Sequence, residues 1–486
     1  MTSADTARTA AHAATYPVRT FPDGFVWGTA TAAYQIEGAV AEDGRTPSIW
    51  DTFSHEPGRI IDGTTGDVTC DHYHRYAEDV ALMADLGLSS YRFSIAWPRI
   101  VPAGSGAVNQ AGLDFYSRLV DALLEQGIEP LATLYHWDLP QALQDAGGWT
   151  NRDTAQHFAD YARVVGAALG DRVPTITTLN EPWCAAFLGY GSGVHAPGIV
   201  DNAGALAAVH HLNLAHGLGA AALRAVLPPS GRVSLTLNLA VVRAAGDTEA
   251  DRAAVRHVDG LANRIFLDPV LRGRYPDDVL DELRHITDWS FIRDGDTALI
   301  NAPIDVLGIN YYTPTAVTAA TPALLAQAAG HRAHEPQTAE QPIAVPGTDR
   351  AFTVPEPGPR TEMGWLIEPG SLTELLLRVH RDYPGMPLMI TENGAAFADE
   401  PAADGVVHDA DRIDYLHGHL SAVHDAISQG ADVRGYYCWS FMDNYEWAWG
   451  LTKRFGLVYV DFDTGERWLK DSAWWYRNVI ARNGLD

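Results

Sequence analysis

Short apolar runs alternate with helix-like segments along most of the chain. Runs rich in β-branched and aromatic residues are typical of buried strands, whereas apolar positions three and four residues apart are typical of amphipathic helices. The first pattern predicts strands within segments 21–35, 89–95, 130–135, 173–179, 232–238, 305–312, 387–391 and 433–440. The second predicts helices within segments 73–83, 113–123, 158–165, 203–227, 253–270, 371–383, 411–429 and 474–481.

Strands that mostly alternate with helices, without a domain-sized interruption, predict an α/β fold, a single (β/α)8 TIM barrel with extended βα loops. The predicted domain covers 17–486, and residues 1–16 are expected to form a disordered lead-in. Segment 313–360 has no sustained periodicity, so we interpret it as a long loop. The helix within 253–270 is expected to end at Pro269 and Gly273. A doubly wound open sheet is the alternative, but no glycine-rich phosphate motif opens any predicted helix.

Charge and cysteine content narrow the class of protein. The 34 Lys and Arg against 61 Asp and Glu give a net charge of −27, which repels nucleic acid and anionic membranes and favours a neutral small molecule as partner. The sequence has no apolar segment long enough to span a membrane and no signal-peptide core at its start. Cys70, Cys184 and Cys438 are an odd number without a close pair, which favours reduced, buried thiols and a cytoplasmic location.

Two glutamates stand where predicted strands end. Glu181 follows the apolar run 173–179, and Glu392 follows the run 387–391. A carboxylate at a strand mouth avoids the cost of full burial yet stays partly desolvated, so its neighbours can change its pKa. Two such groups suit the cleavage of a glycosidic bond, in which one protonates the leaving oxygen and the other attacks the sugar or activates water. Either glutamate, considered alone, is explained equally well as a structural residue that forms an ion pair at the end of its strand.

In a (β/α)8 barrel, side chains at the carboxyl ends of the strands meet on one face, where the chemistry takes place. Polar and aromatic residues at the predicted strand ends are Gln35, Arg92, His136, Asn180, Glu181, Tyr312, Glu392 and Trp439. His72 and His74 lack the spacing of a metal site, so we interpret them as surface histidines and predict neither metal nor cofactor.

Seven short motifs in order resemble those of glycoside hydrolase family 1, the β-glucosidase family. They are 25–37, Tyr135–Asp138, Thr178–Pro182, Asn310–Tyr312, Ile390–Gly394, Trp439–Ser440 and Asn444–Trp447. The resemblance implies a retaining mechanism, with Glu392 as nucleophile and Glu181 as general acid and then general base. It places Arg92 and Tyr312 beside Glu392, where a cation and a donor would keep the nucleophile ionised. Retention requires the two carboxyl groups to lie roughly 5 Å apart.

The same resemblance implies a sugar-binding set, since a pyranose offers a ring of hydroxyls and an apolar face. The implied substrate-binding residues are Gln35, His136, Trp137, Asn180, Asn310, Tyr312, Trp439, Glu446, Trp447 and Phe455. Asn180, next to the acid, is expected at the sugar 2-hydroxyl, and Trp439 and Trp447 are expected to form platform and wall. Trp449 and Leu451 depart from the residues common in this loop of the family, which leaves the aglycone preference open.

The predicted function is a β-glucosidase, with β-galactosyl or β-fucosyl residues as further substrates, acting on small glycosides such as cellobiose or aryl glucosides in cellulose and polysaccharide degradation. A 6-phospho-β-glucosidase is an alternative, although the carboxylate of Glu446 would repel a phosphoryl group. A transglycosidase and a sugar-binding barrel without turnover are further alternatives. The sequence does not decide whether the protein forms a homo-oligomer.

Overall fold

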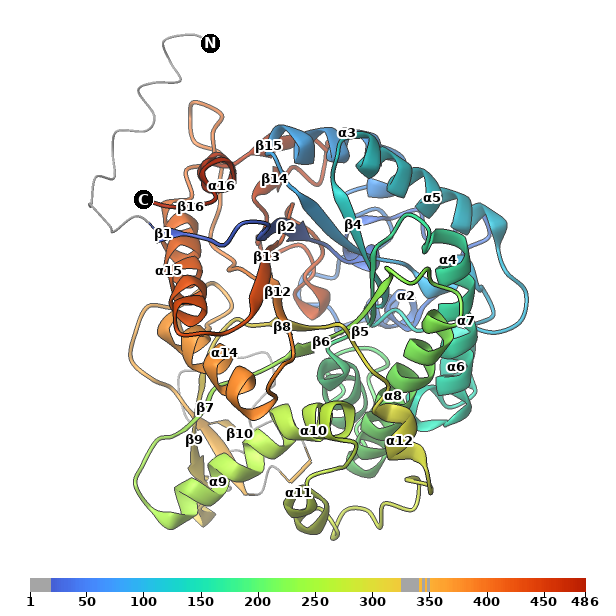
Figure 1. Cartoon of the computed structure of the whole chain (residues 1–486), viewed down its shortest axis with the longest axis vertical. Helices are drawn as coiled ribbons and strands as arrows, with labels where there is room; N and C mark the ends of the chain where they lie inside the picture. The colour runs from blue at the N-terminus through green and yellow to red at the C-terminus, as the bar shows by residue number, and fades with distance from the viewer. Residues whose placement is uncertain (1–18, 325–340, 343–345, 348–349) are drawn as a thin grey trace.

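Eight parallel strands close into a barrel at the centre of the molecule (Figure 1). The computed structural model describes residues 19–324, 341–342, 346–347 and 350–486. The barrel strands are β2 (Val26–Ala30), β3 (Ser90–Ser94), β4 (Glu129–Tyr135), β5 (Thr175–Asn180), β6 (Arg232–Asn238), β8 (Val306–Asn310), β12 (Leu388–Asn393) and β13 (Val433–Trp439). They neighbour one another in chain order, and β13 pairs with β2 to close the ring.

The predicted (β/α)8 barrel is confirmed, and each predicted strand segment overlaps one barrel strand. Strands such as β3 and β8 are buried along their whole length, because side chains fill the barrel on one face and helices cover the other. Two-sided burial explains why a strand such as β8 is mostly apolar, whereas β3 also carries Arg92, whose guanidinium bonds to Glu392 inside the barrel.

Helices surround the barrel in Figure 1. The longer ones are α3 (His72–Asp85), α5 (Gln110–Glu125), α7 (Asp153–Leu169), α8 (Asn202–Arg224), α9 (Glu249–Asp259), α10 (Ile265–Arg272), α14 (Gly370–Asp382), α15 (Ala410–Ser428) and α16 (Asp471–Arg482). Shorter ones are α1 (Ala33–Ile36), α2 (Ile49–His55), α4 (Trp97–Ile100), α6 (Gln141–Asp145), α11 (Asp277–Glu282) and α12 (Asp296–Ile300). The 3₁₀ turns η1 (Gly148–Thr150) and η4 (Trp447–Trp449) and the π-helical segments η2 (Cys184–Gly191) and η3 (Gly260–Arg264) complete the set.

The expected end of a helix at Pro269 is wrong, because Pro269 lies inside α10. Proline lacks the backbone N–H that would bond to the carbonyl of Ile265 four residues earlier. The side-chain amide of Asn213 on α8 donates to that carbonyl instead, at 3.1 Å. The helix ends where the other signal predicted, at Gly273, whose φ of 67° is the left-handed conformation that glycine adopts readily.

The segment 313–360 lies in an extended βα loop of the barrel, as predicted, but it contains short strands that its sequence did not predict. It contributes β9 (Thr315–Ala319), β10 (Gln341–Pro342) and β11 (Ala351–Val354), which form a small sheet with β7 (Val242–Ala244). Helix α9 covers this sheet, where the Asp251 carboxylate accepts hydrogen bonds from the Thr318 hydroxyl and the Ala319 amide. Within this segment, 325–340, 343–345 and 348–349 lie outside the described residues, as does the predicted lead-in 1–16.

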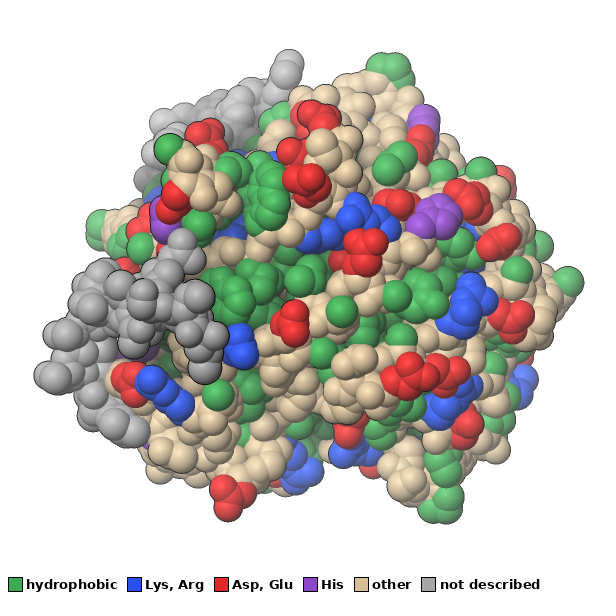
Figure 2. All heavy atoms as spheres, turned by 90° about the horizontal axis from the view of Figure 1, so that it is seen from above, with side chains coloured by type: hydrophobic (Ala, Val, Ile, Leu, Met, Phe, Trp, Pro, Cys, Tyr) green, Lys and Arg blue, Asp and Glu red, His purple; other side chains and the backbone are tan. Residues whose placement is uncertain are grey.

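The two ends of the described chain meet, since β1 (Arg19–Thr20) pairs with β16 (Gly484–Leu485). A hairpin of β14 (Val458–Val460) and β15 (Arg467–Leu469) follows the last barrel strand. Acidic side chains are scattered over the face drawn in Figure 2 and do not gather in one patch. Within the part of the chain that is described, every helix is too short or too polar to cross a bilayer.

The structure decides the predictions about the three cysteines and about His72 and His74. All three cysteines are buried free thiols, as predicted. His72 is not a surface histidine, because it is buried and its Nδ1 bonds to the Asp79 carboxylate at 2.7 Å. His74 is exposed.

Candidate active site

The predicted site residues meet at the carboxyl-terminal mouth of the barrel. They come from seven of the eight barrel strands or from the loops that follow them, so the closed barrel brings together residues that lie far apart in sequence. The set comprises Gln35 after β2, Arg92 on β3, His136 and Trp137 after β4, Asn180 and Glu181 at the end of β5, Asn310 and Tyr312 at the end of β8, Glu392 on β12, and Trp439, Glu446, Trp447 and Phe455 on or after β13.

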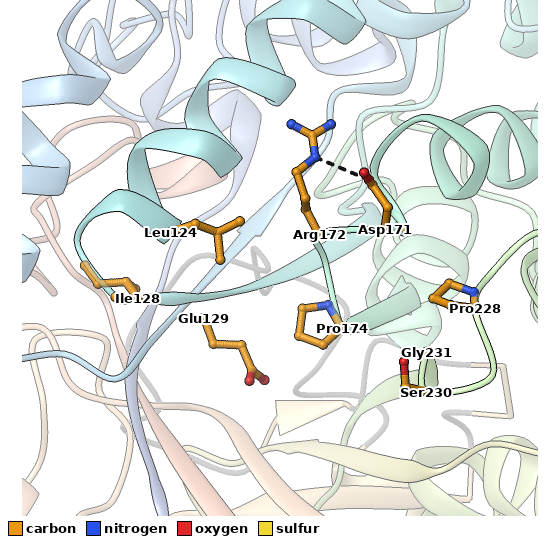
Figure 3. Close-up of a pocket in the computed structure, with 11 residues that line it drawn as sticks. Leu124, Ile128, Glu129, Asp171, Arg172, Pro174, Pro228, Ser230 and Gly231 are labelled. Atoms are coloured by element: carbon orange, nitrogen blue, oxygen red, sulfur yellow. Dashed lines mark hydrogen bonds and ion pairs between the residues drawn. The ribbon is translucent and has the colours of Figure 1, made fainter.

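A separate hollow of about 320 Å³, drawn in Figure 3, lies at the opposite end of the barrel. Glu129 is the first residue of β4, Pro174 immediately precedes β5, and Gly231 immediately precedes β6. These are amino-terminal strand ends, where barrel residues serve stability more than chemistry. The hollow therefore takes no part in the candidate site.

The backbone at the strand mouths is bent into an unusual conformation. Glu181, Trp137 and Trp447 have φ values of 46°, 76° and 49°, in the left-handed region that non-glycine residues rarely occupy. Each such residue costs of order 1–3 kcal/mol and persists only where its surroundings hold it. The bend at Glu181 directs the chain from β5 into η2, whose first residue is Cys184.

Glu392 has a cation and a phenol as its partners. The Arg92 guanidinium donates to Oε1 at 2.6 Å, and the Tyr312 hydroxyl donates to Oε2 at 2.7 Å. Both charged side chains are almost fully buried, 1% and 4% exposed for Arg92 and Glu392, so the pair is hardly screened by water. The two donors hold both carboxyl oxygens of Glu392 in place.

Both hydrogen-bond partners of Glu181 among the described residues are neutral. The Asn310 amide donates to Oε1 at 2.6 Å, and the Cys184 thiol donates to Oε2 at 3.1 Å. Burial, followed by the charge of Glu392, raises the pKa of Glu181 to about 8. A carboxyl in this environment holds a proton at neutral pH.

Asn180 and Asn310 connect the two glutamates. The Asn180 side-chain oxygen accepts from Arg92 at 2.6 Å and from Asn310 at 3.0 Å. Since Arg92 also bonds to Glu392 and Asn310 to Glu181, a continuous hydrogen-bonded chain runs between the carboxyl groups. Thr391 donates to the Asn310 oxygen at 2.7 Å and so fixes the direction in which that amide points.

Besides Arg92, whose Nε is unpaired, three side chains at the mouth carry a buried polar atom without a hydrogen-bond partner among the described residues. They are Nδ1 of His136, Oε1 of Gln35 and Oε2 of Glu446. The Asn180 amide nitrogen lies 3.0 Å from His136 Nε2, which must accept, so Nδ1 carries the ring proton. Burial, and to a lesser degree Arg92, lowers the pKa of His136 well below its usual value and keeps the ring neutral. Gln35 is oriented by bonds from its amide nitrogen to Asn444 and to the Tyr445 carbonyl.

Aromatic rings enclose this polar group. Trp439 and Trp447 each stack on His136 with ring centres 5.9 Å apart, and Trp137 contacts Trp447 at 4.5 Å. Phe455 lies on another side, 6.4 Å from the ring of Tyr312. The predicted aromatic residues are therefore gathered around the mouth.

Sequence reasoning missed three residues here. Cys184, taken only as a buried thiol, contacts Glu181, and the Asn238 amide donates to its sulfur at 3.7 Å. The sequence signal for this contact is the spacing, because Cys184 lies three residues after Glu181, where a helix begins. Trp365 packs 5.1 Å from Tyr312 and comes from a loop whose sequence gave no signal.

Ionic groups at the mouth offer no evident metal site. Within the described ranges, no group of three or more His, Cys, Asp or Glu side chains is arranged to hold a metal ion. The expectation of an enzyme without metal or cofactor stays a prediction.

A closed (β/α)8 barrel with two carboxyl groups in unlike environments at its mouth defines the class as glycoside hydrolases. The family model for glycosyl hydrolase family 1 matches residues 18–485, and the chain belongs to that family.

Individual relatives agree with this assignment. The bifunctional β-D-glucosidase/β-D-fucosidase of Bifidobacterium breve is 55% identical over 469 residues, covering 95% of this chain and 98% of that protein. Thermostable β-glucosidase B of Thermobispora bispora is 54% identical over 468 residues, covering 96% and 91%. The structure of a Thermotoga maritima β-glucosidase in complex with deoxynojirimycin has a TM-score of 0.88 and 45% identity, covering 96% of this chain and 100% of that one.

Proposed function

We propose that the protein is a retaining β-glucosidase that removes terminal non-reducing β-D-glucosyl residues, with β-fucosyl and β-galactosyl residues as further substrates. The activities of the relatives support this reading, and the unlike environments of Glu181 and Glu392 are the observation that carries it. Glu392 has a guanidinium and a phenol as partners, whereas Glu181 has an amide and a thiol. One group is thus suited to attack as a carboxylate and the other to arrive protonated.

In the first step, a carboxylate oxygen of Glu392 attacks the anomeric carbon while Glu181 gives its proton to the glycosidic oxygen. The bond from that carbon to the glycosidic oxygen breaks, the alcohol leaves, and an ester joins the sugar to Glu392. In the second step, the Glu181 carboxylate takes a proton from water, whose oxygen bonds to the anomeric carbon as the ester breaks. The product keeps the β configuration, and both glutamates return to their starting states.

The unpartnered buried atoms support a sugar ring as the ligand at the mouth. A buried polar atom without a partner is costly, and sugar hydroxyls would provide partners for His136 Nδ1, Gln35 Oε1 and Glu446 Oε2. Trp439 and Trp447 would form the platform and wall, with Trp137 and Phe455 beside them. Asn180 uses one amide hydrogen on His136, and its second would serve the 2-hydroxyl.

The side chains of the candidate site favour an unphosphorylated sugar. The buried carboxyl of Glu446 offers a phosphoryl group no positive charge, and the nearby Lys453 ammonium already donates to the Glu362 carbonyl at 2.8 Å. Cellobiose and aryl β-glucosides are the proposed substrates, with a role in cellulose degradation. The sugar analogue bound to the Thermotoga maritima relative supports a small glycoside at this place.

Proton NMR of fresh product from an aryl β-glucoside tests the mechanism. We expect β-glucose first, and α-glucose first would overturn the assignment of both glutamates. A 6-phosphoglucoside should be a poor substrate; preferential cleavage of it would favour the phosphoglycosidase. Added alcohol acceptors should divert only a minor share of the product, and a predominant share would favour a transglycosidase.

Azide separates the two proposed roles. Glu392→Ala should lose roughly 10⁴-fold or more of turnover, as when a nucleophile is removed. Azide should restore part of it and give the inverted α-glucosyl azide, because the anion fills the vacated space. In Glu181→Ala, azide should instead attack the glycosyl-enzyme and give the retained β-glucosyl azide. A retained product from Glu392→Ala would contradict its role as nucleophile.

We also propose a cytoplasmic location and one catalytic domain over 17–486. The buried free thiols suit a reducing compartment, and the pairing of β13 with β2 and of β16 with β1 ties the last strands to the first. Cell fractionation tests the location, and a single unfolding transition tests the domain. The oligomeric state stays open to sedimentation analysis.

A further inference from the structure

We propose that Cys184 is a positioning residue whose thiol holds and tunes the Glu181 carboxyl through a direct hydrogen bond. This inference rests on the proposed role of Glu181 as acid and base. It extends that role to a residue that does not itself touch the reacting atoms.

The direction of the thiol proton follows from its two polar neighbours. Sγ of Cys184 lies 3.1 Å from Oε2 of Glu181, and the amide nitrogen of Asn238 lies 3.7 Å from the same sulfur. The amide nitrogen of Asn238 only donates, so the sulfur accepts from it, and the thiol hydrogen points to Oε2 of Glu181, which keeps a lone pair to accept it in either protonation state. Asn310 donates to the other carboxyl oxygen, and the carboxyl is therefore held from both sides.

The local backbone fixes this contact. The bend at Glu181, with φ of 46°, turns the chain so that the Cys184 amide donates to the Glu181 carbonyl at 3.0 Å. Residues three apart are thereby joined through both backbone and side chain. Cys184 is 7% exposed, so its thiol is fixed in a packed wall of the mouth.

The surrounding charges keep Cys184 a thiol. Glu392 on β12 and Glu446 after β13 face it together with Glu181, and burial with these three carboxyl groups raises the pKa of the thiol well above its usual value. Among the described residues, Arg92 on β3 and Tyr312 after β8 also interact with Glu181. The thiol is therefore a donor at every working pH, and it is not a nucleophile.

The chemical nature of the donor matters for acid catalysis. A hydrogen bond to a carboxylate favours its ionised form and so lowers its pKa, against the effect of burial. A thiol is a weak donor, whereas a hydroxyl is a strong one. A sulfur at this position orients the carboxyl while leaving it able to hold a proton near neutral pH.

The pH dependence of kcat/KM for an aryl β-glucoside in Cys184→Ser and Cys184→Ala tests the proposal. Serine and alanine have nearly equal volumes, so any water admitted by the smaller side chain is common to both variants, which differ only in the donor. The basic limb reports the proton on Glu181 in the free enzyme. We expect the serine variant to lose activity about 0.5–1 pH unit below the alanine variant, so that it is about three- to tenfold less active at high pH. Coincident basic limbs would overturn the proposal.

Cys70→Ser is the matched control, because this buried thiol donates to the Asp443 carbonyl and has no hydrogen bond to either glutamate in the described structure. Its basic limb should coincide with that of the wild type. A shift in Cys70→Ser as large as that in Cys184→Ser would also contradict a specific role.

The S–H stretching band gives a second readout. Cys184→Ser identifies the band by difference. Above the Glu181 pKa of about 8, where the wild-type carboxyl is ionised, we expect the band to move to higher frequency in Glu181→Gln, because the charged acceptor is lost. An unmoved band would refute the hydrogen bond. A wrong assignment of Glu181 as general acid would give a different result. Glu181→Ala would then cleave substrates with poor and with good leaving groups equally well, whatever the Cys184 variants do.

Discussion

Replacing Glu392 by glutamine is expected to lower the pKa of Glu181 strongly. Burial is the largest cause of that raised pKa of about 8, and the charge of Glu392 is the next. If the carboxyl groups lie roughly 5 Å apart, at an effective dielectric constant of about 20 their charges repel by about 3 kcal/mol, or roughly 2 pKa units. Glutamine removes this repulsion, and the Arg92 guanidinium then faces Glu181 without a charged partner. We therefore expect a pKa of about 6 or below.

Carbon NMR of protein labelled at the glutamate carboxyl carbons measures this pKa directly, and Glu181→Gln in the same background identifies the resonance. Glu446→Gln is the matched control. Burial raises the pKa of the Glu446 carboxyl to about 8 as well, so that group is mostly neutral at pH 7 and its removal should change the pKa of Glu181 little. A change of less than half a unit in Glu392→Gln would refute the electrostatic coupling of the pair.

Two predictions concern stability. Between pH 4.5, the usual pKa of a glutamate, and about pH 8, Glu181 holds a proton in the folded protein but not in the unfolded chain. The contribution of Glu181 to the free energy of unfolding therefore falls as pH rises through this window. Glu181→Gln should match the wild type near pH 4 and be more stable by about 2–4 kcal/mol at pH 8, measured by urea unfolding; equal stability at pH 8 would contradict the raised pKa. Asn213→Ala should lower the free energy of unfolding by about 1–3 kcal/mol, since the Ile265 carbonyl freed by Pro269 loses its donor, and a loss below about 0.5 kcal/mol would count against that account.

The barrel could be predicted because its strands are buried on both faces and separated by helices. Segment 232–238, for example, coincides with β6, whose central residues are all buried. The helix across Pro269 could not be predicted, since the donor that satisfies its freed carbonyl is Asn213, far away in sequence. The strands β9 and β11 were missed for a similar reason: they are short, and β9 pairs with β11 on one side and with the distant β7 on the other.

The location of the candidate site could be predicted from the same logic. Parallel strands in a closed barrel bring all their carboxyl ends to one face, so Arg92, Asn180 and Glu392 meet although they are far apart in the chain. The sequence does not determine which polar side chains of the site form hydrogen bonds with each other. The contact of Cys184 with Glu181 depends on the bent backbone after β5, and that of Asn238 with the sulfur depends on where β6 ends.

The placement of one cation decides how the two glutamates differ. Arg92 bonds to Glu392 directly and reaches Glu181 only through the neutral amides of Asn180 and Asn310. Had the guanidinium bonded to both carboxyl groups, both would ionise at neutral pH and no proton would remain for a leaving oxygen. Neutral donors orient the Glu181 carboxyl without adding a charge, so burial keeps its pKa high. When the charge of Glu392 is lost in the proposed covalent intermediate, the repulsion disappears and Glu181 can ionise, which is the change that turns an acid into a base.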